Sequence, residues 1–165
     1  MTTKATLLEQ FTTCYDENGW FVALENAVKD LTAEQANWKT ENLDNSIWEI
    51  LSHLNFYNEA YLKRFKGIDY FYPTNDNDET FAGAETVSEA AWQAEIEKFD
   101  SVMIEWRSLL EAAESGKFDE AVSATNSSAW SSLVAHVNAH NAHHGGQIVV
   151  LRKLQGSWDS KDGVS

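Results

Sequence analysis

Apolar side chains recur every three to four residues along four stretches of the chain, the spacing of one face of an α-helix. The first stretch covers about residues 4 to 31 and carries Leu7, Phe11 and Tyr15 at that spacing. Gly19 marks a point where this helix can bend or divide. The sequence TAEQANW that follows predicts a short helical connector.

The second stretch, SIWEILSHLNFYNEAYLKRF, has the best-marked beginning. Ser46 is a suitable N-cap, and Glu49 three residues later completes the sequence of a capping box. The apolar stripe of this helix contains Ile50, His53, Leu54, Tyr57, Tyr61 and Phe65. A polar connection follows over residues 66–86, and a loop of that length in a compact domain is often functional.

The third stretch begins near Ser88 and ends by Gly116, and the fourth runs from near Ser128 to Gly156. A basic turn precedes Gly156, as is typical of the end of a helix. Between these stretches KFDEAVSATNSS predicts a loop, and no segment shows the sustained alternation of a strand. Four long helices without strands predict an all-α fold, a four-helix bundle with long crossover loops.

Composition narrows the class of protein. The 165 residues suit a single domain that spans the whole chain. A net charge of −14 repels phosphate backbones and anionic lipid surfaces, so we expect binding to neither nucleic acid nor membrane. Cys14 is the one cysteine, which excludes an intramolecular disulfide, and the chain begins without the apolar run of a signal peptide. Both features predict a cytoplasmic location.

Four of the five histidines lie within nine residues of the fourth helix. With His140 at 0° on a helical wheel, His144 falls near about +40°, within the sector of Leu133, Val137, Ile148 and Leu151. His136 and His143 fall near about −40° and −60°, at the edge of that sector. We therefore expect His140 and His144 to point into the bundle. They are one helical turn apart, which lets two imidazoles reach one metal ion.

A third ligand has to come from another helix, and His53 is the remaining histidine of the chain. It lies on the apolar stripe of the second helix beside Ile50 and Tyr57. Three neutral imidazoles would hold a divalent metal and leave coordination positions for water or substrate. Imidazole suits several metals, of which we expect zinc or nickel, with iron or manganese as alternatives. The competing interpretation is that each histidine is a core residue with its own hydrogen-bond partner.

Other kinds of site lack their motifs. A di-iron carboxylate bundle needs a glutamate three residues before a histidine, and none is present. The metalloprotease H-E-x-x-H, the P-loop and G-x-G-x-x-G are also absent. Cys14 has no activating neighbour in the sequence, which favours a small core residue over a nucleophile.

The fourth helix also carries a family signature. HNAHHGGQIVVLRKLQGSW resembles the H-x-x-x-H-x-G-Q-I signature of the DinB-like (DinB/YfiT) superfamily of proposed metalloenzymes. SIWEILSHLNFYNEAYLKRF is similar to the second helix of that family, and NDNDETF to a loop often found after it. The resemblance implies an up-down-down-up bundle and a metal site at His53, His140 and His144, the same three residues. Gln147 matches the family's glutamine, and Gly145 stands where relatives often have arginine.

The same resemblance implies an enzyme acting on a small-molecule substrate. Some members are transferases or isomerases that use low-molecular-weight thiols, and others are described as hydrolases. In either case the histidines would hold the metal, and a general base would be a separate group, for which Glu59, Asp78 and Glu79 are available. Residues 66–86 are our candidate for the pocket wall. A non-catalytic metal-binding stress-response protein and a metal-free interaction module remain alternatives, and by analogy we expect a homodimer.

Overall fold

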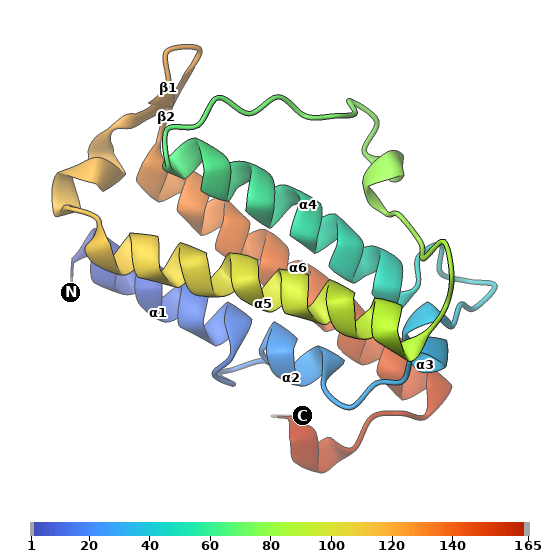
Figure 1. Ribbon diagram of the computed structural model, residues 1–165. Coiled ribbons are helices and arrows are strands. Elements are labelled where there is room, and N and C mark those ends of the chain that lie inside the picture. Colours follow the sequence, from blue (N-terminus) through green and yellow to red (C-terminus); the bar gives the residue numbers. More distant parts are fainter. Residues whose placement is uncertain (1, 164–165) are drawn as a thin grey trace.

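Four long helices form a bundle in the computed structural model, which describes residues 2–163 (Figure 1). They are α1 (Thr3–Tyr15), α4 (Ile47–Phe65), α5 (Glu89–Ala112) and α6 (Trp130–Gln155). Helices α1 and α6 run in one direction, and α4 and α5 run in the other. The predicted all-α four-helix bundle is therefore confirmed, together with its up-down-down-up order.

The predicted first helix over residues 4–31 is divided into α1 and the short α2 (Leu24–Val28). In the loop between them the Asn18 side chain accepts a hydrogen bond from the backbone N–H of Ala23. Such a local side-chain bond competes with the helical pattern and explains why the helix does not continue. The helical connector is confirmed as α3 (Ala33–Asn37), which begins with a capping box.

Helix α4 begins as its sequence predicts. Ser46 Oγ accepts a hydrogen bond from the backbone N–H of Glu49 at 3.2 Å, and the Glu49 carboxylate accepts one from the Ser46 N–H at 2.7 Å. From the end of α4, residues 66–88 run back along the helix to the start of α5 (Figure 1). We call this segment the strap; it contains the 3-10 turn η1 (Asp78–Thr80). The strap lets α4 and α5 lie side by side in parallel.

The prediction that KFDEAVSATNSS forms a loop without strands is wrong. The segment contains the end of the 3-10 turn η2 (Ser115–Asp119) and a hairpin of β1 (Ala121–Ser123) and β2 (Asn126–Ala129). Ser123 Oγ accepts hydrogen bonds from the backbone N–H groups of Thr125 and Asn126, which closes the turn. Strands of three and four residues are too short to show the alternation that predicts a strand.

Buried side chains from the four long helices form one core cluster. Trp92 and Trp106 on α5 are buried, and their indole N–H groups donate to the carbonyls of Leu31 and Asn58. Gly156 ends α6 in the left-handed region with φ 77°, as predicted, and the 3-10 turn η3 (Ser160–Asp162) follows. Within residues 2–163, no helix has both the length and the apolar character needed to cross a membrane.

Candidate metal centre

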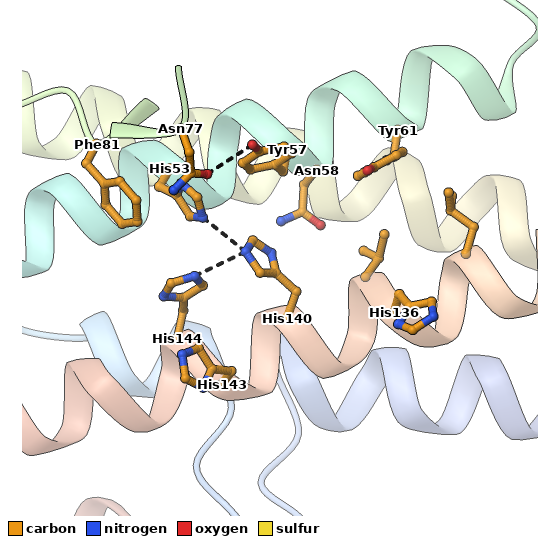
Figure 2. A pocket seen from close by; sticks show the side chains of 12 residues that line it. His53, Tyr57, Asn58, Tyr61, Asn77, Phe81, His136, His140, His143 and His144 are labelled. Atoms are coloured by element: carbon orange, nitrogen blue, oxygen red, sulfur yellow. Dashed lines mark hydrogen bonds between the residues drawn. The ribbon is translucent and has the colours of Figure 1, made fainter. Parts of the chain in front are cut away.

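The three predicted histidines meet between α4 and α6 (Figure 2). His140 Nε2 lies 3.0 Å from His53 Nε2 and 3.1 Å from His144 Nε2. One ring nitrogen from each residue lies within 4.8 Å of the other two. His53 and His144 are buried, and His140 is half-buried. The structure therefore brings His53 of α4 together with His140 and His144 of α6, although His53 and His140 are 87 residues apart in sequence.

The strap fixes the protonated nitrogen of His53. His53 Nδ1 lies 2.6 Å from Thr80 Oγ1, and the Thr80 hydroxyl itself donates to the Asn77 carbonyl at 2.6 Å. Because the hydroxyl hydrogen is already used, Thr80 Oγ1 accepts the hydrogen bond and His53 Nδ1 carries the proton. The lone pair of His53 is then on Nε2, directed at the other two histidines.

Gln147 has the same effect on His144. Its side-chain oxygen lies 2.6 Å from His144 Nδ1, and its amide nitrogen lies 3.2 Å from His143 Nε2. In this amide orientation His144 Nδ1 donates its proton to Gln147, which leaves the lone pair on Nε2. Gln147 therefore holds a histidine of the cluster in the tautomer whose Nε2 lone pair is free.

The cluster has more acceptors than donors. His53 and His144 both present an Nε2 lone pair to His140 Nε2, so a single N–H on His140 could satisfy only one of them well. A cation would satisfy all three. A metal about 2.1 Å from two imidazole nitrogens separates those nitrogens by roughly 3 to 3.4 Å, and the 3.0 and 3.1 Å between the Nε2 atoms match this range. The competing core interpretation fits less well, because the separate partners of His53 and His144 are at Nδ1.

Burial keeps these imidazoles neutral. Burial, together with the neighbouring histidines, lowers the pKa of His53 to about 3 and that of His140 to about 4. Burial also lowers the pKa of His144, against the opposing hydrogen bond from Gln147. Neutral imidazole is the form that binds metal, so at pH 7 the three side chains need lose no proton to act as ligands.

A cavity of about 520 Å³ opens beside the cluster and is lined by all three histidines. The Phe81 ring stacks on the His53 ring at 3.9 Å between centroids. The Tyr57 hydroxyl donates to Asn77 Oδ1 at 3.1 Å, and burial raises the pKa of Tyr57, so that it stays protonated. Since Asn77 and Phe81 belong to the strap, the structure supports the prediction that this segment forms a pocket wall.

The other two histidines are exposed and lie at the edge of the sector, as the wheel predicts. His136 and His143 line the cavity but are not members of the three-histidine cluster. The proposed bases are also outside the wall: the side chain of Glu59 pairs with Lys63 and Lys98, and neither Asp78 nor Glu79 lines the cavity.

Two further positions have packing roles. The Cys14 thiol is buried, donates to the Asn138 carbonyl at 3.2 Å, and has its pKa raised to about 11 by burial. This agrees with the prediction of a core residue. Gly145 is buried against α2, where a Cβ would lie 3.5 Å from Leu24 Cδ2, so this position faces away from the cavity.

An amide pair fixes the spacing of the two helices next to the cluster. Asn58 on α4 and Asn141 on α6 exchange side-chain hydrogen bonds of 2.8 and 3.1 Å, and both residues are buried. Asn58 Nδ2 also donates to the Leu54 carbonyl. The sequence gives no periodic signal for this pair, because asparagines are rarely placed by apolar spacing.

Comparison with known proteins identifies one family. The family model of the DinB superfamily matches residues 20–148. The match includes α4, α5 and the part of α6 that carries His140 and His144. No curated protein and no solved structure matches this chain significantly.

Proposed function

This chain belongs to the DinB superfamily, and on that premise we propose that it is a metal-dependent S-transferase that joins a low-molecular-weight thiol to a small electrophile. One observation carries the proposal: three imidazole Nε2 atoms converge beside a cavity large enough for a small-molecule ligand. His53, His140 and His144 would hold the metal, for which zinc or nickel fits a set of neutral nitrogen ligands.

A bound divalent cation would act as a Lewis acid that favours the nucleophilic thiolate form of a thiol. The protein supplies the surroundings. Thr80 and Gln147 hold His53 and His144 with Nε2 unprotonated. Phe81 covers one face of the His53 ring and keeps water from it. Tyr57 stays protonated, so it can donate a hydrogen bond but does not accept a proton.

Thiol transfer needs less from the cavity wall than hydrolysis does. Among the described residues that line it there is no aspartate or glutamate, so the side chains that could take a proton from attacking water are the exposed His136 and His143. A thiol has a pKa near about 8.5 even without a metal, whereas water has one near about 15.7 until a bound metal lowers it to about 7. In the proposed reaction the sulfur forms a bond to the electrophilic carbon. A leaving group such as chloride departs with the bonding electrons, and the thiol proton passes to solvent.

The test uses protein prepared without a histidine tag, loaded with zinc or nickel, and supplied with chlorodinitrobenzene and a panel of bacterial thiols. We expect conjugation that requires both metal and thiol and is lost in His144→Ala. Hydrolysis of ester probes without a thiol would replace the proposal with a hydrolase. Bound metal with no turnover would indicate a non-catalytic metal-binding protein, and metal content unchanged by His53→Ala and His144→Ala would remove the site. The homodimer stays a prediction, which sedimentation can test.

A further inference from the structure

The cavity continues well beyond the three histidines. On the α4 side it is lined by Tyr57 and Tyr61, and on the α6 side by Leu133, His136 and Val137; we call this part the tyrosine groove. Tyr61 is eight residues after His53, and Leu133 is eleven before His144. At about 1.5 Å per residue the groove extends some 12 to 16 Å along the helices. In Figure 2 Tyr61 and His136 lie at the end away from Phe81 and His144.

The described part of the cavity wall lacks the four residue types that are ionised at neutral pH. Among the described residues that line it there is no lysine, arginine, aspartate or glutamate. The nearest guanidinium stacked on a wall residue is that of Arg64, over the Tyr61 ring. Arg64 also lies over the ring of Tyr72 and donates to the Tyr72 hydroxyl and the Tyr70 carbonyl, which occupies it on the strap side. An anionic ligand would therefore find no protein cation in the groove.

Apart from the exposed imidazole of His136, the polar groups of the tyrosine groove are largely occupied by protein partners. The Asn58 amide is held by Asn141 and the Leu54 carbonyl. The Tyr57 hydroxyl donates to Asn77. A ligand in the groove therefore meets few unused donors and acceptors. A charged group of the ligand would be buried there without a partner, which costs binding free energy.

Two aromatic rings form the α4 wall. The rings of Tyr57 and Tyr61 lie one turn apart, 6.3 Å between centroids and inclined by 22° to each other. The Tyr57 hydroxyl is bonded to Asn77, and the Arg64 guanidinium lies over the Tyr61 ring, so the surface that remains for contact is mainly aromatic carbon. Leu133 and Val137 supply aliphatic surface on α6. A flat apolar ring placed between such walls gains both burial and stacking.

We propose that the electrophilic substrate of this protein is uncharged and aromatic, with its ring in the tyrosine groove and its reactive carbon near the three histidines. The position of the reactive carbon rests on the proposed function. The position of the ring rests on the groove alone. The chain's net charge of −14 adds a long-range penalty for an anion. The charge of a bound metal adds a short-range penalty for a cation and would attract an anion, so titrations without metal give the preference of the groove itself.

Calorimetric titration of zinc-loaded protein tests the inference with three ring compounds that share a hydroxymethyl group. They are neutral nitrobenzyl alcohol, a benzenesulfonate, which is a poor metal ligand, and a phenyltrimethylammonium cation. We expect the neutral compound to bind about tenfold more tightly than either charged one. Equal or tighter binding of the sulfonate or the cation would overturn the inference.

A matched pair of variants locates the preference. His136→Arg places a cation in the groove and should strengthen sulfonate binding about tenfold. Leu154→Arg adds the same charge at an exposed position of α6 outside the cavity and should change nothing. An equal effect of both variants would contradict a groove-specific origin. Zinc content is measured in every sample, and the titrations are repeated without metal. Absence of zinc would defeat the proposed transferase, whereas loss of the neutral preference would defeat this inference.

Discussion

Two polar clusters lie between helices of this bundle, and they differ in how their groups are matched. Between α1 and α5, Arg107 pairs with Asp16 at 2.6 Å and the Tyr15 hydroxyl donates to Asp100 at 3.3 Å. Both hydrogen bonds join a donor to a carboxylate across the two helices, although Arg107 Nε is buried without a hydrogen-bond partner. Between α4 and α6, three imidazole Nε2 atoms face one another with lone pairs in excess of protons. The first cluster pairs its cation and its hydroxyl with carboxylates, whereas the second has lone pairs that a cation could satisfy.

The difference shows how a structural polar cluster is told from a ligand site. Both clusters are partly buried and join two helices, so residue type and burial do not separate them. The positions of the hydrogen atoms separate the two clusters. Thr80 and Gln147 take the Nδ1 protons of His53 and His144 and so leave Nε2 as an acceptor on each.

The largest expected effect comes from removing a member of the unmatched cluster. His140→Ala should lower zinc affinity by at least about 100-fold, because His140 Nε2 lies beside both other nitrogens. Competition against a chromophoric chelator measures this. Arg107→Met in the matched cluster should leave zinc affinity unchanged. It should lower the midpoint of thermal unfolding by only about 2–4 °C, as expected for a partly exposed ion pair worth about 1 kcal/mol or less. Comparable losses of zinc affinity in both variants would show that the two clusters do not differ as described.

A smaller effect is expected when the hydrogen-bond partner of a ligand is removed. Thr80→Val keeps the shape of the side chain but cannot accept the proton of His53 Nδ1, so zinc affinity should fall about tenfold. Thr80→Ser should restore it. Thr74→Val is the control, since Thr74 lies on the same strap and hydrogen-bonds to Glu79 rather than to a histidine. If Thr80→Val and Thr74→Val have the same affinity, Thr80 does not position His53.

The two clusters should also respond to pH with opposite signs. In metal-free protein the pKa of His53 is about 3 and that of His140 about 4, below the value of about 6.5 for unfolded chains. As the pH falls below about 6.5, the unfolded state binds protons that the folded state does not, so the free energy of unfolding decreases. Urea denaturation at pH 7 and pH 5 should show a smaller decrease for His140→Ala than for the unchanged protein. A decrease of the same size would contradict the effect of burial on His140.

The smallest effect is expected from the matched cluster. Burial raises the pKa values of Asp100 and Glu25, so their protonation favours the folded state at low pH, and this contribution is lost as the pH rises through the raised pKa. Asp100→Asn keeps an acceptor for the Tyr15 hydroxyl and removes the charge. The variant should be slightly more stable than the unchanged protein at pH 7, and this difference should shrink at pH 4. A constant difference across this range would contradict the sign.

Helical periodicity predicted the bundle and the inward direction of His140 and His144, because both depend on local spacing along one helix. His53 could be added because it was the remaining histidine on an apolar stripe. Thr80 could not be predicted: it lies 27 residues from His53, on a strap whose path is set by tertiary contacts rather than by a periodic pattern. The same reason explains why Asp78 and Glu79 were available in the sequence but lie outside the cavity wall. Glu59 lies on α4 itself, where its side chain pairs with Lys63 and Lys98.

X-ray absorption by zinc-loaded, untagged protein tests the central claim most directly. The account predicts one zinc per chain with three imidazole nitrogens at about 2.0–2.1 Å, and loss of that signal in His140→Ala. Protein that retains no zinc, or a zinc spectrum unchanged by His140→Ala, would contradict the claim that the unmatched lone pairs of His53, His140 and His144 form a metal site.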